Sequence, residues 1–204
     1  KMKKLILIDG NSILFRAYYA TAYPGATLMQ TSKGEYTNAL FAFVNMFTKI
    51  VTNGEENVLV AFDTSEPTFR HLSYDEYKAG RKEMPAELAE QIPRVYEYVR
   101  LMGIKAYCKG GYEADDIIGI YATDASSKGI KVDIYSSDRD LLQLVSDNVT
   151  VNLLKKGMQE VSSYTPKTLF DEFELTHNQI IDLKSLMGDS SDNIPGVPGV
   201  GPKT

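Results

Sequence analysis

Leu5-Ile6-Leu7-Ile8-Asp9-Gly10-Asn11 is the segment that decides the fold class of this 204-residue chain. An apolar run that stops at an Asp-Gly-Asn turn is typical of a short buried strand followed by a tight turn. Residues 12–20 continue with apolar side chains at helical spacing, so we expect a helix directly after the turn. The segment therefore predicts a strand, a turn that carries an acid, and a helix.

The same order of elements recurs along the chain. Two more apolar strands are expected at residues 58–62 and 131–136, and each is followed by an aspartate. Weaker strands are expected at 104–108 and 149–154, and helices at 37–52, 85–102, 113–127, 166–173 and 177–187. Strands that alternate with helices predict an α/β fold built on a mostly parallel central sheet, flanked by helices.

Composition excludes several classes of protein. Hydrophobic residues make up 43% of the chain and charged residues 24%, which is typical of a globular protein and not of a disordered one. No apolar run is long enough to cross a bilayer and no signal-peptide pattern opens the chain, so we expect no membrane partner. The single cysteine, Cys108, excludes a disulfide framework and fits a reducing cytoplasm.

The net charge of −5 argues against a nucleic-acid partner, because proteins that bind phosphates usually carry a basic surface. A bulk charge does not show where the acids lie. Their positions therefore decide whether this argument holds.

Three of the acids, Asp9, Asp63 and Asp138, follow predicted strands. An aspartate in this place is often only a turn former or a helix N-cap. Three of them on one sheet favour a site instead, because open parallel sheets bind ligands at the carboxyl ends of their strands.

Further acids stand close to these in the sequence. Glu113 and Asp116 are three residues apart and share one face of the expected helix, whereas Asp115 lies farther round and is the least supported by spacing. The remaining candidates are Asp140, Asp189 and Asp192. Nine carboxylates in one cleft need cations, since unpaired and partly buried charges are unfavourable.

The candidate ligands are all carboxylates, which suits Mg²⁺ or Mn²⁺ and not zinc. Their spacing does not match an EF-hand loop, so a calcium module is not expected. Many carboxylates around divalent cations are typical of phosphate-ester chemistry, in which two ions support the attacking and the leaving oxygen.

A basic segment with interleaved tyrosines occupies residues 69–82. It contains Arg70, Lys78, Arg81 and Lys82 together with Tyr77, a mixture that suits single-stranded nucleic acid. An ordinary solvated helix is the alternative. Lys78 and Arg81 are three residues apart, so both could reach one phosphate.

A glycine-rich stretch at residues 196–203, near the end of the chain, contains Gly196, Gly199, Gly201 and Lys203. A flexible tail is one interpretation. Because the stretch follows a predicted helix, we favour the hairpin of a helix-hairpin-helix unit, whose backbone N–H groups bind phosphate without reading sequence.

Taken in order, these segments resemble the 5′-nuclease domains of bacterial DNA polymerases I, which are members of the flap endonuclease family with a PIN-like fold. The resemblance runs from about residue 4 to 204. It is carried by Leu7-Ile8-Asp9-Gly10-Asn11, Phe62-Asp63, Phe69-Arg70, Tyr77-Lys78-Ala79-Gly80-Arg81, Gly111-Tyr112-Glu113-Ala114-Asp115-Asp116, Ser137-Asp138-Arg139-Asp140 and Gly188-Asp189-Ser190-Ser191-Asp192-Asn193-Ile194-Pro195-Gly196.

The resemblance implies that all nine acids serve two divalent ions. It assigns a first acid group (Asp9, Asp63, Glu113 and Asp115, with Asp116 beside them) to one ion. It assigns a second acid group (Asp138, Asp140, Asp189 and Asp192) to the other. It also implies an arch segment at about residues 66–94, through which a 5′ single strand passes and in which Lys78 and Arg81 contact the phosphate.

The resemblance further implies a nuclease core at 1–170 and a helix-hairpin-helix segment at 171–204, which we expect to be incomplete because the family has further helices there. It allows a potassium ion at this hairpin. The expected partners are DNA with a 5′ flap, a nick or a branch, and a covalently linked polymerase domain; we expect a monomer.

We therefore expect a structure-selective 5′-nuclease. The alternatives are a DNA-binding module without turnover and an aspartyl-phosphate phosphatase, which would need a second acid where this chain has Asn11. His71, His177 and Cys108 have no partners at ligand spacing, so we expect structural roles for them. With the nine acids set aside as ligands, 18 acids against 22 basic residues leave a balance of +4, which suits a DNA-binding surface.

Overall fold

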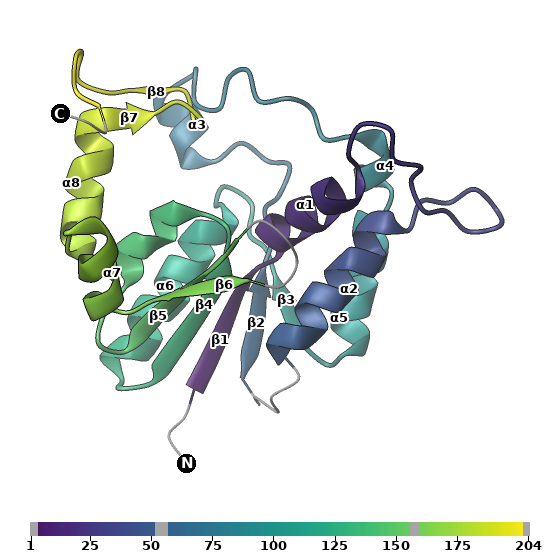
Figure 1. The fold of residues 1–204 in the computed structure, drawn as a ribbon, viewed down its shortest axis with the longest axis horizontal. Helices are drawn as coiled ribbons and strands as arrows, with labels where there is room; N and C mark the ends of the chain where they lie inside the picture. Colours follow the sequence, from purple (N-terminus) through teal and green to yellow (C-terminus); the bar gives the residue numbers. More distant parts are fainter. Residues whose placement is uncertain (1–3, 52–56, 156–159, 202–204) are drawn as a thin grey trace.

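The computed structural model of the protein describes residues 4–51, 57–155 and 160–201. These residues form a six-stranded sheet of order β3-β2-β1-β4-β5-β6, with helices on both faces (Figure 1). Its strands are β1 (Lys4–Asp9), β2 (Val58–Ala61), β3 (Lys105–Tyr107), β4 (Lys131–Ser136), β5 (Val149–Leu154) and β6 (Val161–Tyr164). The first five are parallel and β6 runs antiparallel to β5, which confirms the predicted α/β fold with a mostly parallel sheet.

Strand β1 lies in the middle of the sheet and is buried on both faces. Ile6 and Ile8 point into one core and Leu7 into the other, as the two-residue period of a strand requires. An apolar run without polar alternation is what a parallel strand covered on both sides needs.

One face of the sheet is covered by α1 (Gly10–Thr21), α2 (Asn38–Val51), α4 (Ala86–Ala89) and α5 (Ile92–Leu101). Its largest fully buried side chains include Phe43 and Phe47 of α2, whose rings are stacked with centroids 5.3 Å apart. The opposite face carries α6 (Ala114–Ser127), the 3₁₀ helix η1 (Arg139–Leu144), α7 (Pro166–Phe173) and α8 (His177–Met187).

The remaining elements lie beyond the carboxyl ends of the strands. Helix α3 (Phe69–Ser73) begins the arch segment, which then runs across the top of the sheet to α4 (Figure 1). The two-stranded β7 (Gly188–Asp189) and β8 (Ile194–Pro195) follow α8 and lie beside the arch segment. The backbone N–H of Lys78 donates to the carbonyl of Asp192 at 2.9 Å, so the two segments are joined directly.

Two expectations about the fold are wrong. The single helix expected at 85–102 is two helices, α4 and α5, because Pro93 stands in the first turn of α5, where it cannot donate to the preceding turn. Strand β6 was not expected, since its Val-Ser-Ser-Tyr sequence has no apolar run. It pairs on the outer edge of β5, where only one face is covered.

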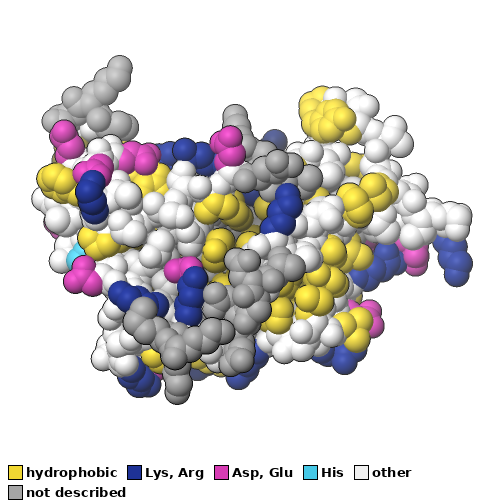
Figure 2. Space-filling model, turned by 60° about the horizontal axis from the view of Figure 1, so that its bottom comes forward, with side chains coloured by type: hydrophobic (Ala, Val, Ile, Leu, Met, Phe, Trp, Pro, Cys, Tyr) yellow, Lys and Arg dark blue, Asp and Glu magenta, His cyan; other side chains and the backbone are white. Residues whose placement is uncertain are grey.

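The order of the strands places a topological switch point between β1 and β4, because the chain proceeds outward from β1 in one direction and then returns to β4 on its other side. Ligands bind at such points, beyond the carboxyl ends of the strands. On the face that Figure 2 shows, basic and acidic side chains are interspersed without a dominant patch of either sign. No helix within the described ranges is long and apolar enough to span a bilayer.

Candidate active site

Asp9 stands at the switch point, at the end of β1. Its Oδ1 accepts from the backbone N–H of Ser12 at 2.9 Å and caps α1, and its Oδ2 accepts from the hydroxyl of Ser136 at 2.7 Å. The residue is only 5% exposed. Burial, with smaller contributions from the neighbouring Asp63 and Asp138, raises the pKa of Asp9 to about 6.

Asp63 follows β2 and connects the first acid group to α6. Its Oδ1 accepts from the backbone N–H of Ala114 at 2.7 Å, at the first residue of that helix. Its own N–H donates to Oδ1 of Asn11 at 3.0 Å. Asn11, which counts against a phosphatase of the aspartyl-phosphate type, thus orients the turn after β2.

The start of α6 supplies three more acids. Glu113 is the N-cap residue, and its N–H donates to Oδ2 of Asp116 at 3.0 Å. Asp115, the acid least supported by spacing, is strongly desolvated in the cleft. Burial and the negative charges of Asp9 and Asp138 hold the pKa of Asp115 well above its ordinary value.

The second acid group comes from two distant segments. Asp138 caps η1 by accepting from the N–H of Asp140 at 2.8 Å, and burial raises the pKa of Asp138. Asp189 lies in β7, where its Oδ1 accepts from the N–H of Ser191 at 2.8 Å and from its hydroxyl at 2.6 Å. Asp192 follows in the turn before β8.

All nine acids line one cleft of about 1290 Å³, as the sequence predicted. Cationic and hydroxyl-bearing side chains line it as well, namely Arg70, Tyr77, Lys78, Arg81 and Lys184. The cleft lies where parallel strands end. The ends of strands and helices therefore bring together acids that are as far apart in the sequence as Asp9 and Asp192, which 183 residues separate.

Five of the acids are ion-paired in the described part of the chain. Their shortest N–O distances are 2.7 Å for Lys78–Glu113, 2.8 Å for Arg70–Asp116, 2.6 Å for Arg81–Asp192, 2.7 Å for Lys184–Asp140 and 2.6 Å for Lys184–Asp189. The Arg70 guanidinium donates to both oxygens of Asp116 in the bidentate geometry that suits a planar fork.

These pairs lower the pKa of two carboxyls. Burial alone would raise the pKa of Asp189, but the hydrogen bonds from Lys184 and Ser191 outweigh it and bring the value to about 2. Burial likewise opposes the hydrogen bonds from Arg70 and from the Glu113 N–H at Asp116, and the pKa of Asp116 is lowered. Both carboxylates are therefore charged at neutral pH.

The other four acids, Asp9, Asp63, Asp115 and Asp138, have no Lys, Arg or His partner among the residues that the structure describes. Burial raises the pKa of Asp9, Asp115 and Asp138, and the negative charges of neighbouring acids add to this effect. No three acids, histidines or cysteines in the described ranges converge into a ready metal cage. The nine residues share a cleft, and their role as ligands stays a prediction.

The predicted DNA-binding residues occupy different environments. Tyr77 is buried, and its hydroxyl lies 3.3 Å from Oε2 of Glu113 and 3.2 Å from Oδ2 of Asp192, so that its one proton can be donated to either, whereas Lys82 is exposed. Lys78 has a φ of +57°, which turns the chain so that Lys78 and Arg81 reach two different acids. That both cations can reach one phosphate stays a prediction.

The glycines of the hairpin have unlike roles. A Cβ on Gly196 would lie 2.2 Å from the Met187 carbonyl group, so Gly196 allows the hairpin to pack against the end of α8. Gly199 has a φ of +83°, and open space surrounds the positions where Gly199 and Gly201 would carry a Cβ. Lys203 lies outside the described residues.

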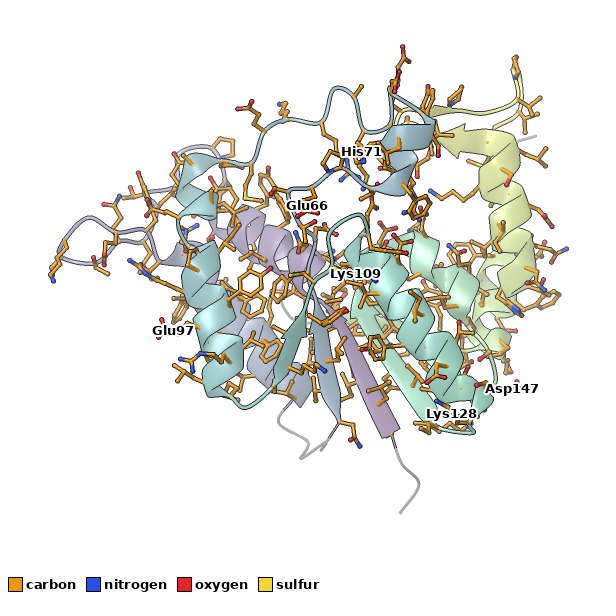
Figure 3. All side chains as sticks on the ribbon, turned by 180° about the vertical axis from the view of Figure 1, so that it is seen from behind. Glu66, His71, Glu97, Lys109, Lys128 and Asp147 are labelled. Atoms are coloured by element: carbon orange, nitrogen blue, oxygen red, sulfur yellow. The ribbon has the colours of Figure 1, made fainter. Side chains whose placement is uncertain are left out.

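The histidine of the basic segment has the structural role that the sequence indicated. His71 Nδ1 accepts from the N–H of Thr68 at 3.1 Å at the start of α3, as part of a capping arrangement. Figure 3 shows Lys128 and Asp147 at the opposite end of the sheet from His71.

Sequence reasoning missed three polar residues of the site. Ser136 and Arg16 position the loop after β4; the Arg16 Nε donates to Ser137 Oγ at 2.8 Å, and its terminal nitrogens donate to the carbonyls of Leu154 and Lys155. Lys184 bridges two acids. A signal for Lys184 existed, since it stands four residues after the buried Ile180 and so shares its inward face on α8.

Comparison with known proteins agrees with this geometry. The chain matches a family model described as 5′-3′ exonuclease, N-terminal resolvase-like domain, over residues 4–174, and one described as 5′-3′ exonuclease, C-terminal SAM fold, over residues 175–204. It is 49% identical to DNA polymerase I of Bacillus caldotenax and 46% identical to that of Bacillus subtilis (strain 168). Each alignment covers 99% of this chain but 23% and 22% of the relative, so the chain spans less than a quarter of their length.

Solved structures share the fold. The T5 D15 protein co-crystallised with metal ions superposes with a TM-score of 0.71 at 22% identity, covering 98% of this chain and 72% of that one. The catalytic core of Rad2 in complex with a DNA substrate gives 0.60 at 17% identity, covering 100% and 59%. On the sequence match over residues 4–174, this chain belongs to the 5′-3′ exonuclease family.

Proposed function

We propose that this chain is a metal-dependent, structure-selective 5′-nuclease that hydrolyses phosphodiester bonds at the 5′ ends and 5′ flaps of DNA. The observation that carries the proposal is the convergence of nine carboxylates, with Lys78 and Arg81 above them, in one cleft at the switch point of the sheet. Family membership supports the reaction class.

Divalent cations fit the chemistry of the cleft. Asp9, Asp63, Asp115 and Asp138 offer only oxygen ligands and have no cationic partner among the described residues, so divalent ions would offset the cost of burying negative charges close together. Oxygen ligands favour Mg²⁺ or Mn²⁺. Two such ions, when bound, supply charge stabilisation at the attacking and the leaving oxygen of the phosphodiester.

The chain's own residues orient these ligands. The N–H of Ser12 and the hydroxyl of Ser136 fix both oxygens of Asp9, and the N–H of Ala114 fixes one oxygen of Asp63. Asp115 lies among them with no fixed cation, which leaves it available as a ligand. Preorganised ligands of this kind lose little freedom when a cation binds.

Lys78 and Arg81 would bind the scissile phosphate. Their ion pairs with Glu113 and Asp192 keep both cations over the cleft, and a phosphate would exchange one anionic partner for another. The Lys78 ammonium also lies 5.0 Å from the ring centroid of Tyr77, which limits its freedom. Both cations can therefore stabilise the charge that develops on the phosphate.

The DNA partner is expected to contact the surfaces on either side of the cleft. The arch segment would take the 5′ single strand, with Arg70 and Lys82 near its phosphates. The hairpin at Gly196, Gly199 and Gly201 would contact the duplex backbone, together with Lys203 and a potassium ion. Because the relatives are DNA polymerases I, we also propose a linked polymerase domain and roles in primer removal and nick processing.

We further propose a monomer that acts in the bacterial cytoplasm, in keeping with its bacterial relatives and with the single cysteine, Cys108. A DNA-binding module without turnover is the second candidate. It is favoured by the ion pairs that occupy five of the nine acids within the described ranges.

A cleavage assay separates the two candidates. A 5′-labelled flap substrate, a blunt duplex and a free single strand are incubated with the protein in Mg²⁺, in Mn²⁺ and in EDTA. The nuclease predicts cleavage of the flap substrate near its junction, faster than of the other two, and none in EDTA. Binding of the flap without cleavage in either metal would support the second candidate.

A further inference from the structure

Lys184 pairs with two acids of the cleft at once. Its ammonium lies 2.7 Å from Oδ1 of Asp140 and 2.6 Å from Oδ2 of Asp189. These acids belong to η1 and β7, which are far apart in the sequence. One side chain from α8 therefore joins the two segments that provide the second acid group.

The position of Lys184 is fixed by its helix. Ile180, one turn earlier, is 7% exposed and anchors this face of α8 in the core. Lys184 stands in the last turn of α8, where the helix dipole favours a cation. Its ammonium is thus held in the cleft, and the side chain keeps 39% of its surface exposed.

Both oxygens of Asp189 already have hydrogen-bond donors. Its Oδ1 accepts two hydrogen bonds from Ser191, and its Oδ2 contacts Lys184. A divalent ion binds a carboxylate oxygen at about 2.0–2.1 Å, and an ammonium has no lone pair with which to join its coordination shell. An ion bound at Oδ2 would therefore stand close to the ammonium, whose positive charge repels it.

We infer that Lys184 is a built-in counter-cation of the second acid group, which holds Asp140 and Asp189 together in the absence of a divalent ion and weakens the binding of an ion to them. The inference rests on the proposed function, because it takes the second acid group as a metal site. When ionised, this group carries four negative charges, of which Lys184 and Arg81 compensate two.

Titration calorimetry of the DNA-free protein with Mn²⁺ alone tests this inference. The variants are Lys184→Met, which removes the charge, and Lys184→Arg, which keeps it. Lys167→Met is the matched control, since Lys167 pairs with Asp171 on α7 and neither residue lines the cleft. In Lys184→Met, the more weakly bound of the two Mn²⁺ ions should bind at least about tenfold more tightly than in the wild type, because a positive charge close to that ion is removed. Lys184→Arg and Lys167→Met should resemble the wild type.

A double-mutant cycle locates the effect. In an Asp189→Asn background, Lys184→Met should tighten Mn²⁺ binding by much less, since one of the two acids that Lys184 compensates is gone. Thermal melting gives a second readout. Lys184→Met should lower the melting temperature in EDTA and should regain more of it on Mn²⁺ addition than the wild type does.

Other results overturn the inference. Unchanged or weaker Mn²⁺ binding by Lys184→Met would overturn it, and Lys184→Gln carries the same test if the Met variant does not fold. Unchanged Mn²⁺ binding with weaker DNA binding would make Lys184 a phosphate ligand instead. If the wild type binds no Mn²⁺ at all, the proposed function fails together with the inference.

Discussion

The hydroxyl of Ser136 donates a hydrogen bond of 2.7 Å to Oδ2 of Asp9, across two neighbouring strands of the sheet. The same hydroxyl accepts from the N–H of Asp138 at 3.0 Å. Ser136 is fully buried. One side chain therefore sets the relative positions of two acids that come from opposite sides of the switch point.

Replacing Ser136 by alanine should destabilise the metal-free protein by about 1–3 kcal/mol, because a buried carboxylate oxygen loses its donor. The loss of that donor should also raise the pKa of Asp9 further and weaken metal binding. Urea unfolding in EDTA measures the first effect. Ser73→Ala is the control, since the Ser73 hydroxyl is exposed and donates to the Phe69 carbonyl within α3. Equal stability of the two variants would contradict the assigned role.

The raised pKa of Asp9 makes a prediction about pH. Its folded-state pKa of about 6 lies above the unfolded value of 3.8, so the folded protein binds this proton more tightly. The contribution of Asp9 to stability is therefore greatest below about pH 4 and declines as the pH rises through 6. Asp9→Asn should then stabilise the metal-free protein by about 1–3 kcal/mol more at pH 7.5 than at pH 4. Unfolding measured at both pH values checks this, and a difference that does not change with pH would refute it.

The Arg70–Asp116 ion pair should contribute more to the stability of the fold than exposed ion pairs do. The side chain of Asp116 is 16% exposed, so Arg70→Met leaves a partly buried carboxylate without its cation. We expect Arg70→Met to lower the free energy of unfolding by about 1–3 kcal/mol, and we expect the addition of Asp116→Asn to restore much of this loss. Lys128→Met, which removes a pair that is 61% exposed on both sides, should cost about 0.5 kcal/mol or less. Additive effects of Arg70→Met and Asp116→Asn would show that the pair is not coupled.

Lys78 and Arg81 should affect turnover more than folding. Single-turnover cleavage of a 5′ flap should slow by about 10²-fold in Lys78→Ala or Arg81→Ala, since each removes a donor to the developing charge. Lys82→Ala is the comparison, because Lys82 is exposed and does not line the cleft. Lys82→Ala should weaken DNA binding and reduce the slope of log affinity against log salt concentration by about one. The cleavage rate at saturating DNA should not change. Equal effects of all three variants on the cleavage rate would contradict a special role of Lys78 and Arg81 in turnover.

The sequence predicted the parallel sheet and the cleft for identifiable reasons. The apolar runs at 58–62 and 131–136 each end close to an acid, and parallel strands bring these ends to one edge. Strand β6 could not be predicted, because its pairing depends on the exposed edge of β5 and not on its own residues. The break at Pro93 could have been predicted from the missing N–H.

The partners of the acids are the part of the site that the sequence could not supply. Spacing made Asp115 the weakest candidate at the start of α6, yet burial, together with the charges of Asp9 and Asp138, holds its pKa well above the ordinary value. Lys184 pairs with Asp140 across 44 residues, and Arg70 with Asp116 across 46. Contacts of this range depend on how α3 and α8 pack over the sheet, which local pattern does not determine.

In the proposed mechanism, this cleft cuts DNA with the help of divalent ions held by the acids that have no cationic partner among the described residues. Mg²⁺-dependent cleavage of a 5′-flap substrate by Asp115→Asn tests it most directly, with Asp171→Asn on α7 as the control outside the cleft. We expect a loss of about 10²-fold or more in the cleavage rate for Asp115→Asn, with unchanged folding, and wild-type activity for Asp171→Asn. Wild-type cleavage by a folded Asp115→Asn protein would contradict it.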